Sequence, residues 1–189
     1  VPKDIKGRVS LLEGISVIES NTFSSCDITG IDIPVGVTSI KQYAFSNCSS
    51  LTGSLVIPDK VKKIPQQAFY GSGFTGTLTL PKGLTEIGSY AFSGCSGLNS
   101  IIFPNGLTSI GSGAFERSGL VSIILPESLT SIGSEAFSSC SSLASITFPE
   151  SLTSIGSEAF SFCRGLTSIT LPESLTSIGS DVFEYCINI

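Results

Sequence analysis

The chain has 189 residues, which is enough for one domain with a sizeable buried core. It contains no histidine, so Ser-His-Asp and Cys-His catalytic sites and histidine-ligated metal sites are excluded. The net charge of -5, from 10 basic and 15 acidic residues, argues against a nucleic-acid partner. Serine, threonine, glycine and proline interrupt every apolar stretch before the roughly 18–20 residues of a membrane-spanning helix. We therefore expect no enzymatic activity, no cofactor and no direct membrane insertion in this segment.

The N-terminal residues differ from the rest of the chain. Residues 1–10 are expected to form an N-terminal cap or the remnant of a leader. Their basic residues are Lys3, Lys6 and Arg8. Ile5 and Val9 can cover the open core of the segment that follows, which runs from residue 11 to residue 189.

That segment is built from one repeated unit. A phenylalanine, usually preceded by alanine, returns every 22 to 24 residues, at Phe23, Phe45, Phe69, Phe92, Phe115, Phe137, Phe160 and Phe183. Seven of the nine prolines follow an apolar residue in the same rhythm, at Pro34, Pro58, Pro81, Pro104, Pro126, Pro149 and Pro172. This period, with fixed apolar positions, predicts a leucine-rich repeat solenoid of about eight coils, the first divergent and the last truncated.

The residues around Ile146 show what each position does. Ile146 and Phe148 alternate with Ser145 and Thr147, as on a strand with one buried face. Pro149 ends this strand because proline cannot donate a hydrogen bond to a sheet.

The second half of the same unit turns back toward the core. Leu152 and Ile155 are expected to enter the core from the opposite wall. Ser157 is a good helix N-cap and Glu158 suits the first turn, so a single helical or 3-10 turn is predicted here. The side chains that this turn would direct inward are Ala159, Phe160 and Cys163.

Two glycine positions carry structural information. Glycine follows the inward isoleucine in five coils, but Lys41 and Pro65 occupy that position in two others, so no positive φ is required there. Gly53 and Gly76 accompany an extra residue before the strand, which a β-bulge can absorb.

The pattern P-x-x-L-T-S-I-G-x-x-A-F-x-x-C-x-x-L-x-x-I-x-L/F resembles the BspA-like subclass of leucine-rich repeat proteins, across residues 11–189. The resemblance implies a curved, right-handed solenoid with a concave parallel β-sheet. It also implies an extracellular or cell-surface protein of a host-associated microbe, with a role in adhesion or virulence and a host matrix or microbial surface protein as ligand.

All six cysteines occupy one repeat position, three residues after the repeat phenylalanine. They are Cys26, Cys48, Cys95, Cys140, Cys163 and Cys186, and serine fills the position in the two remaining coils. One repeat position forms one column, so the favoured interpretation is a structural column of buried thiols. A disulfide between neighbouring coils is the alternative.

The outward positions of the concave strands are the candidate ligand-binding residues, because repeat proteins usually bind there. They are Val56, Thr79, Ser100, Ile102, Ser122, Ile124, Ser145, Thr147, Ser168 and Thr170. Ile102 and Ile124 make an apolar patch on an otherwise small and neutral face. Strand propensity alone would also explain these β-branched residues.

Two further groups of residues are candidate sites. Glu127, Glu150 and Glu173 follow the prolines in a column, which is solvated or, as an alternative, binds calcium. Phe162 and Tyr185 share a position that elsewhere holds small or polar residues, so they are a candidate interface or a shield for the end of the solenoid.

The sequence thus predicts a non-enzymatic surface module that binds a protein ligand through its solenoid. A structural spacer or oligomerisation scaffold and a carbohydrate-binding accessory module are the alternatives. Homodimerisation through the uncapped C-terminal coil is a further expectation.

Overall fold

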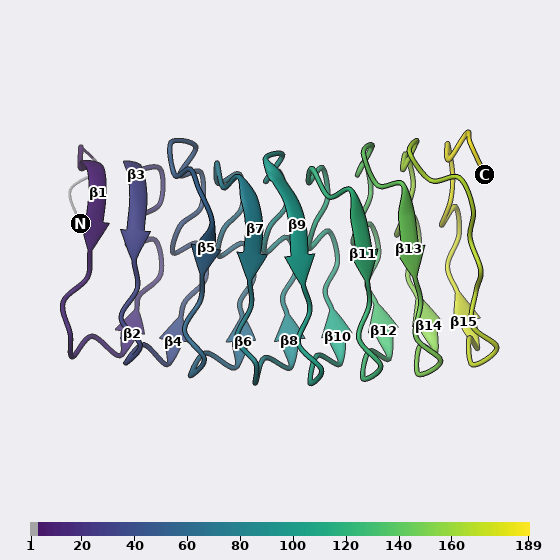
Figure 1. Cartoon of the computed structure of the whole chain (residues 1–189), viewed down its shortest axis with the longest axis horizontal. Helices are drawn as coiled ribbons and strands as arrows, with labels where there is room; N and C mark the ends of the chain where they lie inside the picture. The colour runs from purple at the N-terminus through teal and green to yellow at the C-terminus, as the bar shows by residue number, and fades with distance from the viewer. Residues whose placement is uncertain (1–3) are drawn as a thin grey trace.

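The computed structural model describes residues 4–189, and these residues form one solenoid of parallel strands (Figure 1). Each coil passes through two walls of strands. The first row consists of β1 (Lys6–Ser10), β3 (Asp27–Asp32), β5 (Leu55–Val56), β7 (Gly76–Thr79), β9 (Leu98–Ile102), β11 (Ser122–Ile124) and β13 (Ser145–Thr147). The second row consists of β2 (Val17–Ile18), β4 (Ser39–Ile40), β6 (Lys63–Ile64), β8 (Glu86–Ile87), β10 (Ser109–Ile110), β12 (Ser131–Ile132), β14 (Ser154–Ile155) and β15 (Ser177–Ile178). The predicted solenoid of about eight coils is confirmed.

Strand pairing is parallel throughout, and it is more continuous in the second row than in the first. In the second row, β2 pairs with β4, and β6, β8, β10, β12, β14 and β15 form one sheet. The first row is divided into three sheets, β1-β3, β5-β7-β9 and β11-β13. The predicted bulge at Gly76 is confirmed, since the register between β7 and β9 shifts between Gly76 and Thr77.

A stack of phenylalanine rings runs through the centre of the core. The repeat phenylalanines from Phe23 to Phe183 lie ring on ring, with 5.2–5.7 Å between successive centroids and interplanar angles of 2–14°. Around this stack the predicted inward residues occupy their walls: Leu152 and Ile155 are buried, and Ile146 and Phe148 pack partly buried against the core. Each coil therefore buries its apolar side chains only against its neighbours.

The predicted helical turn is wrong, and the described residues contain no helix. The wall around each repeat phenylalanine is a series of tight turns in which hydrogen bonds alternate between local and intercoil partners. Ala136 N–H donates to Gly133 O within its coil, whereas Phe137 N–H donates to Ala159 O of the next coil at 2.8 Å. A helix would use every N–H within its own coil, so it could not join neighbouring coils in this way.

Left-handed backbone at two fixed positions makes this wall possible. The residues two before and two after each repeat phenylalanine have φ between 52° and 74° in all eight coils. They are Asn21, Ser25, Tyr43, Asn47, Gln67, Gly71, Tyr90, Gly94, Gly113, Arg117, Glu135, Ser139, Glu158, Phe162, Asp181 and Tyr185. Glu158 is therefore a turn residue, not an acid in the first turn of a helix, and Ser157 is not an N-cap.

The N-terminal residues join the solenoid. Residues 6–10 form β1, which pairs with β3, and Ile5 and Val9 pack partly buried against the core. Lys3 of the expected cap lies outside the described residues. Residues 4–189 contain no helix long and apolar enough to cross a bilayer.

The glycine after the inward isoleucine serves close packing between coils. None of these glycines has a positive φ, as predicted from Lys41 and Pro65 at the same position. A Cβ on Gly111 would lie 2.7 Å from Ser89 N and 2.8 Å from Gly88 C of the preceding coil. Only hydrogen leaves enough room for the backbones to approach this closely.

We predict that Gly111→Ala lowers the free energy of unfolding by about 1–3 kcal/mol, because the backbone of the coil must move to admit the methyl group. The matched control in the same coil is Gly106→Ala, where the added Cβ would meet only Leu84 O, at an ordinary 3.6 Å. Urea denaturation followed by circular dichroism measures both. Equal stability of the two variants would contradict the close-packing explanation.

Candidate binding face

The outward side chains of the first row form the candidate binding face. Every candidate residue from Val56 to Thr170 is exposed there, except Ser100, which is half-buried. Ser168 and Thr170 belong to the eighth coil, where residues 167–171 follow the same path without forming a strand. The structure therefore brings all ten sequence-predicted residues onto one face.

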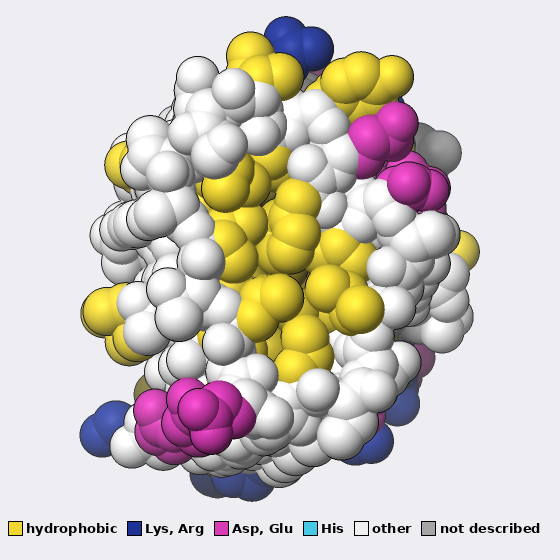
Figure 2. Space-filling view, turned by 90° about the vertical axis from the view of Figure 1, so that its right-hand side faces the viewer, with side chains coloured by type: hydrophobic (Ala, Val, Ile, Leu, Met, Phe, Trp, Pro, Cys, Tyr) yellow, Lys and Arg dark blue, Asp and Glu magenta, His cyan; other side chains and the backbone are white. Residues whose placement is uncertain are grey.

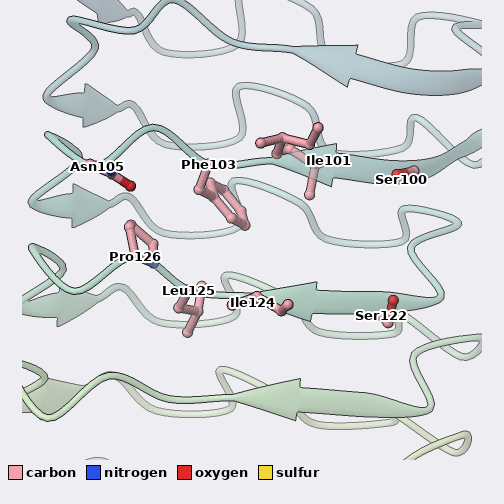
Figure 3. Close-up of a pocket in the computed structure, with 9 residues that line it drawn as sticks. Ser100, Ile101, Phe103, Asn105, Ser122, Ile124, Leu125 and Pro126 are labelled. Carbon is pink, nitrogen blue, oxygen red and sulfur yellow. The ribbon is translucent and has the colours of Figure 1, made fainter.

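Ile102 and Ile124 dominate this face. Their side chains are 71% and 75% exposed, on the neighbouring strands β9 and β11. Between them lies a groove of about 350 Å³, here called the central groove (Figure 3). Ile101, Phe103 and Leu125 of the core line it from below.

The ends of the central groove are polar but uncharged. Ser100 and Ser122 lie at one end, and Asn105 and Pro126 lie at the other (Figure 3). Sequence reasoning found the two isoleucines and the two serines. It missed Asn105, Pro126 and the core residues, because the repeat pattern assigns those core residues to the interior.

The central groove lies where the first row is interrupted. β9 and β11 belong to different sheets, although they are consecutive in the row. Phe115 and Pro126 are 11 positions apart, whereas Phe92 and Pro104 are separated by 12. The interval alone does not locate the groove, because β11 pairs with β13 although their coils differ in the same way.

Two smaller grooves lie at other interruptions of the row. The N-terminal groove, of about 240 Å³, lies between β3 and β5 and includes Asp32, Val56 and Pro58. Phe45 and Pro58 are 13 positions apart, one more than usual. The C-terminal groove, of about 300 Å³, lies between β13 and the eighth coil and includes Phe148, Glu150 and Leu171.

Charge is distributed unevenly along the face. Arg8 binds the Asp32 carboxylate through two nitrogens, and the Ser10 hydroxyl donates to it at 2.8 Å. These hydrogen bonds hold the pKa of Asp32 below its usual value, and the bond from Arg8 has a larger effect than the bond from Ser10. At the other end, Glu127, Glu150 and Glu173 are exposed, and none of them takes part in the ion pairs found among residues 4–189.

The face of the second row is more polar. Ser109, Ser131 and Ser154 lie in register on consecutive strands and, with neighbouring glycines and serines, line a shallow depression. The rows of hydroxyl groups beside it serve the fold, since Thr130 Oγ1 donates to Thr108 O and Thr153 Oγ1 donates to Thr130 O at 3.1 Å. The first row therefore offers the apolar surface, and the second does not.

The expected aromatic interface is a stacked pair, in which Tyr185 is exposed and Phe162 is half-buried. The rings of Phe162 and Tyr185 lie 4.5 Å apart at 25°, and the Arg164 guanidinium carbon lies 6.0 Å from the centre of the Phe162 ring. Tyr185 is 54% exposed, and both aromatics have left-handed backbone. Such conformations are costly for bulky residues, so the repeat geometry and not the residue type fixes the backbone here.

The end of the solenoid at the last coil is apolar. Figure 2 shows hydrophobic side chains gathered in the middle of this end, surrounded mostly by other side chains and backbone, with acidic side chains at its rim. Ile178, Ile187 and Ile189 of the last coil are 50–70% exposed.

The six cysteines form one column, in which five are buried and Cys186 is half-buried. Most members of this column donate a hydrogen bond to the phenylalanine carbonyl of the preceding coil. These donors are Cys48, Ser72, Cys95, Cys140, Cys163 and Cys186, at 2.6–3.2 Å from Phe23, Phe45, Phe69, Phe115, Phe137 and Phe160. Serine and cysteine both supply this donor, which explains why serine occurs in the column.

Burial makes these thiols poor nucleophiles. It raises the pKa of Cys48 and Cys140 to about 11 and that of Cys95 to about 12, and it also raises the pKa of Cys163. Nucleophilic and metal-binding cysteines are thiolates, so the column is suited to packing. Among the described residues, no three His, Cys, Asp or Glu side chains gather as they would around a metal ion.

The chain belongs to the BspA-type leucine-rich repeat family. The model of the BspA type leucine rich repeat region matches residues 16–118 and 62–189, with six copies. Among curated protein sequences, none matches this chain.

Solved structures of bacterial leucine-rich repeat proteins have the same fold. The leucine rich repeat protein of T. pallidum is 30% identical, with a TM-score of 0.68, and the match covers 100% of this chain and 79% of that one. The pneumococcal vaccine antigen PcpA is 31% identical over 71% of this chain, with a TM-score of 0.57; the match spans 38% of PcpA. A leucine rich cell surface protein of Faecalibacterium prausnitzii is 24% identical over 94% of this chain, with a TM-score of 0.60, and the match spans 60% of that protein.

We predict that the buried thiols make the protein sensitive to alkali. Their pKa values are raised in the folded state, so the unfolded chain loses these protons first. Their contribution to stability is complete below the unfolded pKa of about 8.5 and declines as the pH rises toward 11–12, by up to about 1.4 kcal/mol per pH unit for each thiol.

Urea denaturation between neutral pH and pH 10.5, with reductant present, measures this decline. The double variant Cys95→Ser/Cys140→Ser keeps the donor to the phenylalanine carbonyl but removes two of the titrating groups. Its stability should fall less steeply with pH than that of the parent. Identical slopes would contradict the assignment.

Proposed function

We propose that this chain is a non-enzymatic binding module that acts in adhesion at a cell surface, with a host matrix or microbial surface protein as its ligand. The observation that carries the proposal is the pair of exposed isoleucines beside the uncharged central groove. Exposed apolar side chains gathered around a groove are typical of protein-binding surfaces.

The chemistry of the chain supports binding over catalysis. The first-row face has many hydroxyl groups, but the chain has no histidine to activate them. Burial raises the pKa of Cys48, Cys95, Cys140 and Cys163, so these thiols are poor sources of thiolate. What remains is a rigid surface with an uncharged centre and charged ends.

A surface location is supported by a structurally similar cell surface protein. BspA-type repeats occur in this chain, and a leucine rich cell surface protein of F. prausnitzii has the same fold. We extend that location to this chain as part of the proposal.

We predict that Ile102→Asp together with Ile124→Asp leaves the fold intact and weakens ligand binding about 10-fold or more, because the two side chains are the apolar centre of the face. The measurement is binding to an array of folded host matrix proteins, microbial surface proteins and glycans. Leu12→Asp is the matched control, since Leu12 is 78% exposed and lies outside the three grooves.

The array also distinguishes the alternatives. Protein binding that is unchanged in the double variant would contradict a role for this face. Binding to no member of the array would favour a structural spacer, and binding to glycans alone would favour a carbohydrate-binding accessory module.

A second candidate is self-association through the last coil. The apolar end in Figure 2 and the neighbouring stack of Phe162 on Tyr185 support it, since an apolar end face is better covered than solvated.

For the residues 1–189 we predict a concentration-dependent mass in sedimentation velocity, which Ile187→Lys together with Tyr185→Ser reduces to the monomer. Both side chains are more than half exposed, so the substitutions should leave the coil folded. A monomeric mass up to the millimolar range would contradict self-association.

A further inference from the structure

We propose that the ligand of the first-row face is an extended protein segment in the polyproline II conformation, which places an apolar side chain in the central groove and a lysine or arginine, three residues away, over the C-terminal groove. This inference rests on the proposed function and adds the chemistry of the partner.

The central groove selects an uncharged apolar side chain. Its lining contains no charged residue, its floor is made of core side chains, and Ile102 and Ile124 form its walls. A charged group placed there would lose its hydration and find no counterion. An aliphatic or aromatic side chain would instead bury part of the exposed isoleucines.

The C-terminal groove selects a positive charge. Glu150 lines it, and Glu127 and Glu173 occupy the equivalent position in the two adjacent coils. These carboxylates have no ion-pair partner among the described residues, and they repel one another. The surrounding sequence is also predominantly acidic, since residues 101–189 contain eight acidic residues and only two basic ones, Arg117 and Arg164.

The distance between the two grooves sets the spacing in the partner. The central groove lies between β9 and β11, and the C-terminal groove lies between β13 and the eighth coil, so they are two coil steps apart. Two steps of about 4.8 Å amount to about 10 Å along the solenoid axis. A polyproline II segment has three residues per turn and rises about 3.1 Å per residue, so side chains three apart share one face and are separated by about 9 Å.

A β-strand partner fits this spacing less well. Its side chains alternate, so residues that share a face are separated by about 7 or 13 Å. The exposed hydroxyl groups of Ser145 and Thr147 lie on β13 between the grooves. Polyproline II backbone has no internal hydrogen bonds, so its carbonyls are free to accept from these hydroxyls.

A spacing scan tests the inference. The probes are short acetylated and amidated proline-rich peptides that carry one leucine and one lysine, separated by one to five positions and in both orders. Fluorescence anisotropy with residues 1–189 measures their affinity. We expect the tightest binding at a separation of three, and a loss of binding when serine replaces the leucine.

Charge reversal tests the second groove. Glu150→Lys should weaken the best lysine peptide about threefold to fivefold, as for an exposed ion pair, and should strengthen the peptide that carries glutamate instead. Glu158→Lys is the matched control, because it makes the same charge change on the wall of turns. Circular dichroism and thermal unfolding check that both variants are folded.

The outcomes separate this inference from the proposed function. An optimum at another separation, no dependence on separation, or equal effects of the two charge reversals would overturn the inference. If the Ile102→Asp/Ile124→Asp variant still loses its protein ligand in the array, the proposed function stands without it. If that variant binds its protein ligand normally, both the inference and the proposed function are wrong.

Discussion

The stacking of one phenylalanine ring from each coil is the interaction on which the rest of this structure depends. With 5.2–5.7 Å between successive rings, the stack fixes the distance between neighbouring coils close to the spacing of hydrogen-bonded strands. Every other repeat position must then fit that distance. At Gly111 the absence of a side chain permits this close approach, because a methyl group there would press against the backbone of the preceding coil. The phenylalanine carbonyl also accepts the hydrogen bond of the cysteine column, so the stack and the column are one unit.

Stability in such a molecule is shared between coils. The walls are joined by backbone hydrogen bonds from each coil to the next and, on the second row, by threonine hydroxyls that donate to the preceding coil. No coil has a core of its own, so a defect in one coil weakens the contacts of both neighbours. The left-handed residues show the same dependence. Phe162 and Tyr185 adopt a conformation that their side chains disfavour, because the intercoil hydrogen bonds of the wall require it.

The grooves of the candidate binding face lie where the pairing of the first row is interrupted. The first row is interrupted between β3 and β5, between β9 and β11 and after β13, and a groove opens at each interruption. The scaffold and the binding surface are thus encoded at different levels. Apolar repeat positions encode the scaffold, and the outward residues encode the surface. For this reason membership of the BspA-type family establishes the fold, while the ligand depends on residues that the family pattern leaves free.

The sequence alone determined the solenoid, the inward and outward alternation around Ile146, the common column of the cysteines and the apolar pair Ile102 and Ile124. These follow from periodicity, because a residue type repeated at one interval must occupy one wall. Tertiary structure decided the conformation of the wall around each phenylalanine, where Ser157 and Glu158 suggested a helical turn. Local propensity favoured the helix, but the N–H groups needed to join neighbouring coils were available only in a left-handed turn. Tertiary structure also decided where the pairing of the first row is interrupted. The register between two strands depends on both of their coils, so it cannot be read from a single repeat.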